Sequence, residues 1–244
     1  MASAKHSILI VNPNTTQSMT DALKPLVKEI GFQETVFDFF TAPSGVPSIN
    51  NEQDAAISTD ACLPSLIKLI RSYDAFLVCC YSQHPLVSRL RAEASKAGSS
   101  NKPITGILEA SIAFCLQSLD IESKFGIVST GKQWEEILGE ATENLLGCKG
   151  SARYAGTETT GLNADELHST PKVEVDKRMK DATKRLLERG AKAICLGCAG
   201  MAGMDQTIRE ACVEQLGEGG KAIKVVDGVV SGVIHLEGAL RAGM

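Results

Sequence analysis

The sequence predicts an α/β fold made of two similar Rossmann-like domains with parallel sheets. Short apolar runs bounded by turn residues alternate along the chain with stretches of helical periodicity, a pattern typical of parallel α/β proteins. Two pairs of these runs resemble each other at nearly the same separation, which indicates an internal repeat. The length of 244 residues is enough for one large domain or two small ones.

The first part of the chain contains four predicted strands and four predicted helices. The strands are Ser7–Val11, Thr35–Phe40, Ala75–Cys80 and Ile104–Ile107. The helices are Asn14–Ile30, Glu52–Arg71, Pro85–Lys96 and a helix near Glu109–Leu119. The segment Thr41–Ile49 is rich in Pro, Gly and Ser, and we expect a loop that is too long and too patterned to be a mere connection.

The second part repeats this alternation. Its predicted strands are Phe125–Val128, Ala152–Ala155, Ala193–Leu196 and Ile223–Val226. Its predicted helices are Lys132–Leu146, Lys172–Glu188, Asp205–Leu216 and Gly228–Leu240. The last strand follows after the second copy is complete. We therefore expect the first domain to hold residues 1–100 with 212–244, and the second to hold 101–211.

The internal repeat rests on two matches. Ile8–Gln17 resembles Phe125–Gln133, since both contain a strand, a polar turn and a cap residue followed three positions later by Gln. Tyr73–Cys80 resembles Gly190–Cys198. The strand ends of the first pair are 117 residues apart and the final cysteines of the second pair are 118 apart. One common offset favours duplication over chance similarity between strands.

Charge and hydropathy exclude several classes of protein. The net charge is −4 and no run of Lys and Arg occurs, so nucleic acid is not an expected partner. No apolar stretch approaches the ~20 residues of a membrane span. The N-terminal residues lack the core of a signal peptide. We expect a cytoplasmic protein with no membrane partner.

The eight cysteines are expected to be reduced, because the chain is long and shows no secretion signal. Cys195 and Cys198 have CxxC spacing, but no second CxxC accompanies them for a structural zinc site. A redox CxxC normally opens a helix, whereas Cys195 falls inside a predicted strand. We expect no metal here.

Cys80 and Cys198 occupy the more informative positions, at the carboxyl ends of strands where ligands bind in open parallel sheets. If the two halves face each other about a pseudo-two-fold axis, the thiols meet across one cleft. Inversion of a stereocentre beside a carbonyl needs a base on one face and an acid on the other. A thiol has an ordinary pKa of about 8.5 and can serve as either near neutral pH.

The sequence resembles the hydantoin/allantoin racemases of the aspartate/glutamate racemase superfamily, including fungal members. The resemblance covers nearly the whole chain and rests on five motifs. These are Asn12–Thr16, Thr41–Ile49, Cys80 at a strand end, Gly106–Ala110 and Leu196–Met201. It implies an isomerase of two α/β domains that uses no cofactor, forms a homo-oligomer and inverts a cyclic ureide. If the ureide is allantoin, it also implies a role in purine-derived nitrogen use.

Carried over residue by residue, the resemblance makes Cys80 and Cys198 the acid–base pair. It also implies a set of substrate contacts in each half. These are Asn14, Phe40, Val46, Tyr81 and Ser82 in the first half, and Ser129, Thr130, Gly131, Ala199 and Gly200 in the second. Family members commonly carry Phe-Gly-Asp-Pro-Gly after the first cysteine, whereas this chain has Tyr81–Pro85. This departure leaves open which ureide fits.

Several alternatives remain at this stage. Asn14 can be a helix cap instead of a substrate contact, Glu109 can be a first-turn helix residue, and His84 can cap a helix or pair with Cys80. The fold can also serve a small-molecule binding or regulatory protein, or a superfamily enzyme that acts on an amino acid.

Overall fold

The computed structural model describes residues 6–244, which fall into two compact units. The first unit extends to Ala110 and takes up Val229–Met244 at the other end of the chain. The second unit is Ser111–Gly228. The two changes of unit therefore fall inside one helix near residue 110 and at residue 228, instead of at the expected positions near 100 and 212.

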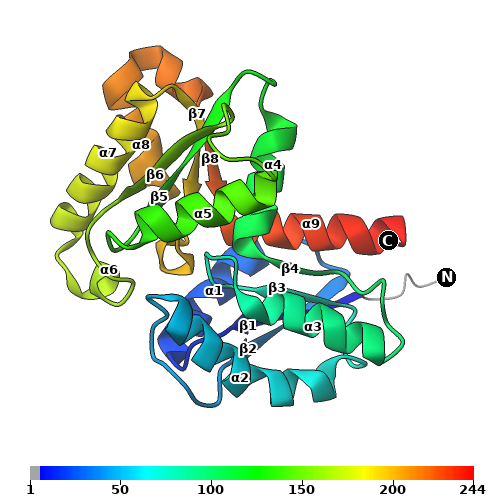
Figure 1. Ribbon diagram of the computed structural model, residues 1–244. Coiled ribbons are helices and arrows are strands. Elements are labelled where there is room, and N and C mark those ends of the chain that lie inside the picture. Colours follow the sequence, from blue (N-terminus) through cyan, green and yellow to red (C-terminus); the bar gives the residue numbers. More distant parts are fainter. Residues whose placement is uncertain (1–5) are drawn as a thin grey trace. The chain divides into compact units, whose positions relative to one another are not determined.

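The first unit is a parallel four-stranded sheet covered by helices (Figure 1). Its strands are β1 (His6–Asn12), β2 (Thr35–Thr41), β3 (Ala75–Val78) and β4 (Ile104–Gly106), in the order β2-β1-β3-β4. Its helices are α1 (Gln17–Glu29), α2 (Glu52–Leu69), α3 (Pro85–Lys96) and most of α9 (Gly228–Ala242). Helix α4 (Ile107–Ser118) begins in this unit and continues into the second.

Alternating strand residues build the core of the first unit, because successive side chains point to opposite faces. Val11 and Val78 lie in one apolar cluster with Leu66 of α2 and Leu90 of α3. On β3 the next side chain toward the amino end, Leu77, meets α9 so closely that a Cβ at Gly232 would lie 2.5 Å from it. The sheet is thereby buried on both faces.

The second unit repeats the architecture. Its strands are β5 (Lys124–Ser129), β6 (Tyr154–Thr159), β7 (Ala191–Leu196) and β8 (Lys224–Asp227), all parallel, in the order β6-β5-β7-β8. Its helices are α5 (Trp134–Leu146), α6 (Glu166–Ser169), α7 (Lys172–Glu188) and α8 (Asp205–Leu216), with the 3₁₀ helices η1 (Ala199–Met201) and η2 (Gly217–Ala222).

The two sheets have the same order when β1 to β4 are matched with β5 to β8. The match extends to single hydrogen bonds. The Cys79 N–H donates to the Val11 carbonyl at 2.8 Å, and the Gly197 N–H donates to the Val128 carbonyl at 2.7 Å. These partners stand at the offsets read from the sequence. The prediction of two similar parallel α/β halves is therefore confirmed.

Two expectations about strands differ from the structure. The last strand does not return to the first sheet, since β8 pairs with β7, and only helix α9 joins the first unit. Strand β6 extends to Thr159 instead of ending near residue 155. Its second half reads as polar, but Glu158 is buried there because Arg185 and Arg189 neutralise its charge. Among residues 6–244, no helix is both long and apolar enough to cross a membrane.

Candidate functional site

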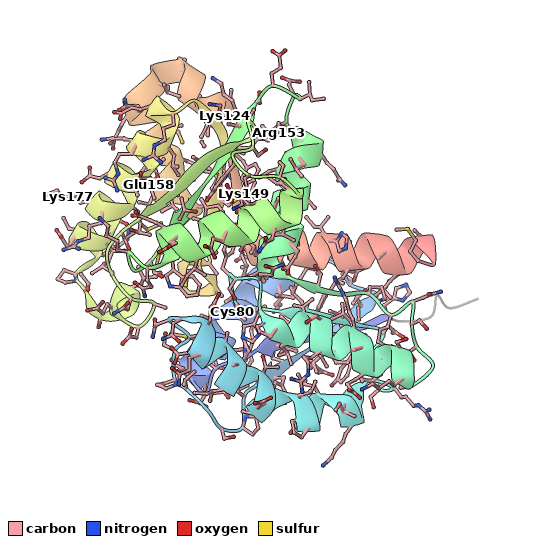
Figure 2. All side chains as sticks on the ribbon, viewed as in Figure 1. Cys80, Lys124, Lys149, Arg153, Glu158 and Lys177 are labelled. Atoms are coloured by element: carbon pink, nitrogen blue, oxygen red, sulfur yellow. The ribbon has the colours of Figure 1, made fainter. Side chains whose placement is uncertain are left out.

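Both cysteines singled out from the sequence lie two residues beyond the end of an equivalent strand. Strand β3 ends at Val78 and Cys80 follows it, as Figure 2 shows. Strand β7 ends at Leu196 and Cys198 follows it. Both are therefore at the carboxyl edge of their own sheet, where parallel α/β folds place their ligands.

The turn after β3 exposes only one of two adjacent thiols. Cys79 is buried, whereas Cys80 is half-buried. The Cys80 Sγ lies 3.4 Å from the Ser82 Oγ, and the Ser82 N–H donates to the Cys80 carbonyl at 3.0 Å. Tyr81 and Ser82 are themselves buried. The chain thus folds back tightly at the thiol, with a hydroxyl beside the sulfur.

His84 begins the helix that follows this turn. Its Nδ1 accepts the backbone N–H of Leu86 at 3.2 Å, and Pro85 occupies the first position of α3, where a missing N–H costs nothing. Burial lowers the pKa of His84 to about 4. The ring is therefore neutral, with its proton on Nε2. Of the roles that the sequence leaves open for His84, namely helix cap, partner of Cys80 and substrate contact, the structure shows the helix cap.

The side chain of Asn14 holds together the turn that follows β1. Its Oδ1 accepts from the Asn12 Nδ2 at 3.0 Å and from the Thr16 N–H at 2.9 Å. Its Nδ2 donates to the Met19 Sδ at 3.3 Å. Asn14 is not the helix cap, since that position belongs to Thr16, but its side chain stabilises the turn that leads into α1.

The long loop after β2 is fastened to this same turn. The Thr15 N–H donates to the Val46 carbonyl at 3.0 Å, and the Thr16 Oγ1 donates to the Pro47 carbonyl at 2.7 Å. Phe40, the penultimate residue of β2, is partly buried against the core cluster that contains residues of α2 and α3. The structure thus brings Asn14 and Val46 together at the carboxyl edge of the first sheet.

The turn after β7 surrounds its thiol with backbone donors. The Gly200 N–H donates to the Cys198 Sγ at 3.3 Å, at the first turn of η1. Burial raises the pKa of Cys198 to about 11, and the N–H groups of Gly200 and Met201 oppose this shift. Ala199 and Gly200 are half-buried beside the sulfur. At neutral pH Cys198 is therefore a thiol.

The residues at the end of β5 are largely committed to the fold. Ser129 is buried and its Oγ donates to the Gly197 carbonyl at 2.8 Å, which links this strand to the Cys198 turn. Thr130 is buried and its carbonyl accepts the Gly161 N–H at 2.9 Å. The amide end of the Gln133 side chain covers Gly131, in the space that a Cβ would occupy. These three residues shape the edge around Cys198.

The structure adds Ser58 as a supporting residue of the first unit, and it places Glu109 in the first turn of α4, where the sequence predicts it. Ser58, fully buried in α2, donates to the Pro13 carbonyl at 2.5 Å and so fixes the Asn14 turn from below. Glu109 folds over Gly106 at the end of β4, its Oε2 has no partner among residues 6–244, and burial raises its pKa. No sequence signal distinguishes Ser58 from other helical serines. Glu109 is marked only by its place after a strand.

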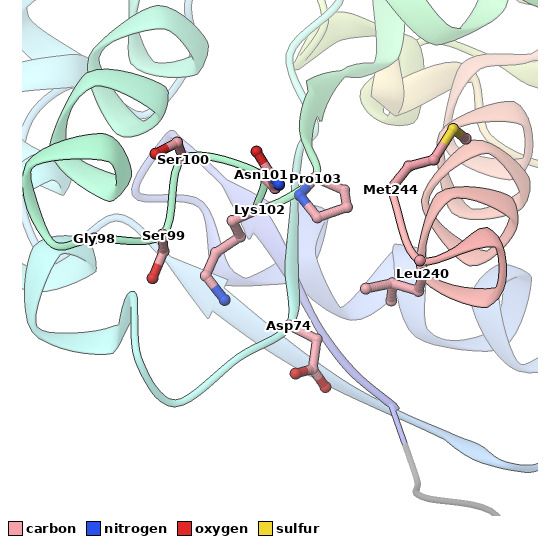
Figure 3. Close-up of a pocket in the computed structure, with 10 residues that line it drawn as sticks. Asp74, Gly98, Ser99, Ser100, Asn101, Lys102, Pro103, Leu240 and Met244 are labelled. Atoms are coloured by element: carbon pink, nitrogen blue, oxygen red, sulfur yellow. The ribbon is translucent and has the colours of Figure 1, made fainter.

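The opposite edge of the first sheet carries a cavity of about 400 Å³ (Figure 3). Asp74 and Lys102, which precede β3 and β4, line it together with Ser99, Asn101 and Leu240. It contains no thiol and lies at the amino ends of the strands, away from Cys80. Within residues 6–244, no group of three or more His, Cys, Asp and Glu is arranged to hold a metal ion.

Comparison with known proteins identifies relatives of the whole chain. The sequence model described as Asp/Glu/hydantoin racemase matches residues 8–236. An uncharacterized protein of Schizosaccharomyces pombe is 34% identical over 97% of this chain and 93% of its own. A hydantoin racemase from a Pseudomonas species is 26% identical over 94% of this chain and 84% of its own.

A solved structure supports the same relationship at the level of the fold. The allantoin racemase from Klebsiella pneumoniae superimposes with a TM-score of 0.79, over 98% of this chain and 89% of that one. The sequence identity is 22%, so this similarity establishes the architecture alone.

Proposed function

The chain belongs to the Asp/Glu/hydantoin racemase family, and on that premise we propose that it racemises a cyclic ureide with Cys80 and Cys198 as acid–base pair. The substrate we propose is allantoin or a 5-substituted hydantoin. One observation carries the proposal: each sheet places a cysteine two residues past the end of the equivalent strand. A reaction that inverts a stereocentre uses a thiol on each face of the carbon, whereas a reaction with one reactive thiol does not use the second cysteine.

The proposed chemistry consists of two proton transfers, one from the substrate carbon and one to it, and needs no electron acceptor. A thiolate removes the proton from the carbon beside the ureide carbonyl, and the other thiol delivers a proton to the opposite face. The raised pKa of Cys198 favours its protonated form and suits it to the donor step in one direction. Cys80 then acts as base, and the roles exchange for the other enantiomer.

We propose substrate contacts at both carboxyl edges. In the first unit they are the turn at Asn14, Phe40 near the end of β2, the loop through Val46, and the segment Tyr81–Ser82. In the second they are Ser129, Thr130, Gly131, Ala199 and Gly200. Backbone N–H groups of the turns suit the oxygen on which negative charge develops, since fixed donors are strongest at such a position. Asn14 would act through the turn, because its side chain is already bonded within it.

The test is the decay of circular dichroism of (R)- and (S)-allantoin and of 5-substituted hydantoins, compared with the spontaneous rate. The natural chain should accelerate the decay of both enantiomers of one substrate. Cys80→Ser and Cys198→Ser should each slow it by about 10³-fold, since each removes one proton-transfer partner. Cys148→Ser is the matched control, because Cys148 is exposed outside both turns.

Incorporation of solvent deuterium separates catalysis from binding. An enzyme of this type exchanges the carbon-bound proton, whereas a regulatory protein that only binds the ureide does not. Full activity in either cysteine variant would overturn the two-thiol mechanism. Exchange of an amino acid in place of a ureide would overturn the substrate assignment but keep the family chemistry.

A further inference from the structure

Two cysteines that the proposed reaction does not use lie in contact inside the second unit. Cys115 of α4 and Cys195 of β7 are 80 residues apart in sequence, and their Sγ atoms are 3.4 Å apart. Both residues are fully buried. A disulfide bond is about 2.05 Å long, so the sulfur atoms need to approach by only about 1.4 Å. A small shift of the two side chains would therefore bring the sulfur atoms to the distance of a disulfide bond.

The charge of Arg153 acts electrostatically on Cys115. Arg153, labelled in Figure 2, precedes β6 and its Nε donates to the Ser123 carbonyl at 2.9 Å. Its Nη2 is buried and has no hydrogen-bond partner among residues 6–244. The contact with Cys195 and burial raise the pKa of Cys115 well above its ordinary value, and the charge of Arg153 opposes this rise only in part. Both sulfur atoms are therefore thiols at rest, and it is the short distance between them that favours bonding.

The position of Cys115 gives a route for a small oxidant. Cys115 lies in the last turn of α4, which ends at Ser118. Its neighbour Phe114 is exposed, so one face of the helix borders solvent. The ends of helices open at a small free-energy cost compared with global unfolding. Fraying of this last turn would admit a molecule as small as hydrogen peroxide.

We propose that Cys115 and Cys195 form a reversible intramolecular disulfide when the protein meets a peroxide. One sulfur attacks a peroxide oxygen, the O–O bond breaks, and a sulfenic acid and one water result. The second sulfur attacks the sulfenic sulfur, the S–S bond forms, and the displaced hydroxide takes the thiol proton as a second water. Two electrons pass from the two thiols to the peroxide, and a dithiol reductant reverses the change.

The test uses the full chain, reduced, freed of reductant and treated with hydrogen peroxide near neutral pH. Remaining thiols are alkylated with iodoacetamide after unfolding, and the non-reduced digest is examined by mass spectrometry. We expect a peptide pair joining Cys115 to Cys195 that loses two hydrogens on oxidation and regains them with dithiothreitol. Cys62 and Cys212 are matched controls, because they are equally buried and should remain alkylatable thiols.

A second measurement does not depend on peptide mapping. A bond that closes so long a loop should raise the midpoint of thermal unfolding by roughly 5–10 °C in the oxidised protein. Cys115→Ala and Cys195→Ala should abolish both the rise and the linked peptides. If neither variant folds, the mapping of the natural chain decides alone.

The proposal is overturned if Cys115 and Cys195 remain alkylatable at a peroxide dose that oxidises the exposed Cys148. It is also overturned if linked peptides join either residue to any other cysteine instead. Because the readouts are mass and thermal stability, the result stands whether or not the chain racemises a ureide.

Discussion

The strand ends before Cys80 and before Cys198 share one backbone hydrogen bond, but they differ in the residue that makes it. In each, the residue before the cysteine donates its N–H to a valine carbonyl on the neighbouring strand. In the first unit that residue is Cys79, whose side chain is 4% exposed. In the second unit it is Gly197. The duplicated fold thus conserves the strand end while the packing around it has diverged.

The difference has a steric cause. A Cβ at Gly197 would lie 2.7 Å from the Val128 carbonyl oxygen and 2.6 Å from a methyl group of Ile127. The Ser129 hydroxyl also bonds the Gly197 carbonyl at 2.8 Å. The equivalent of Ser129 is Asn12, whose Nδ2 instead donates to the Thr20 Oγ1 of α1 at 3.0 Å. The second unit ties its thiol turn to the sheet, whereas the first ties the neighbouring turn to a helix.

The largest expected difference between the two units comes from replacing Gly197 and Cys79 by alanine, one at a time. Gly197→Ala must displace the backbone of a central strand and should cost about 3 kcal/mol or more of the stability of the second unit. Cys79→Ala leaves a small cavity and should cost about 1 kcal/mol in the first. Urea unfolding followed by the fluorescence of Trp134 measures the first effect, because this single tryptophan lies in the second unit.

Far-ultraviolet circular dichroism in the same titration measures both variants. Equal costs for Gly197→Ala and Cys79→Ala would contradict the steric account of the glycine. A large shift in the Trp134 transition for Cys79→Ala would show instead that the two units unfold together.

The helices and the positions of the two cysteines could be predicted from the sequence, whereas contacts between residues far apart in the chain could not. The bounds of α3, α7 and α8 and the positions of Cys80 and Cys198 follow from apolar periodicity and the repeat offset. The length of β6 does not follow, because burial of Glu158 depends on two arginines about thirty residues away. The support of the Asn14 turn by Ser58 is equally invisible, since the serine is 45 residues from Pro13 in sequence.

His84 provides a pH-dependent difference, because the turn after Cys198 contains no histidine. Its pKa is about 4 in the folded chain and about 6.5 unfolded. Because the pKa of His84 is lower in the folded chain, its contribution to folding stability is complete above pH 6.5. This contribution is lost as the pH falls from 6.5 through 4. The loss amounts to about 3 kcal/mol across this window.

The measurement compares His84→Asn with the natural chain by urea unfolding from pH 7 to pH 4. Asn retains an acceptor for the Leu86 N–H but does not titrate. The variant should therefore lack about 3 kcal/mol of the acid sensitivity, while protonation of carboxylates affects both proteins alike. Parallel pH profiles for the two proteins would show that the ring is protonated without penalty.

The smallest expected effect concerns the pKa of Cys198, which decides whether this residue is a thiol or a thiolate in the free protein. Its pKa is raised from 9.0 to about 11, so its thiolate fraction at neutral pH is about 100-fold below that of an ordinary cysteine, equivalent to about 2.7 kcal/mol. Alkylation of Cys198 by iodoacetamide, followed by peptide mass mapping, should rise about tenfold per pH unit up to pH 10 and level off near 11.

The exposed Cys148 is labelled in the same sample and controls for the reagent. A midpoint near or below 8.5 for Cys198 would mean that the N–H groups of Gly200 and Met201 outweigh burial. Cys198 would then be as ready to act as base as to act as acid. A midpoint near 11 would mean that Cys198 must lose its proton before it can act as the proposed base. The two directions of the proposed reaction would then start from differently protonated enzyme.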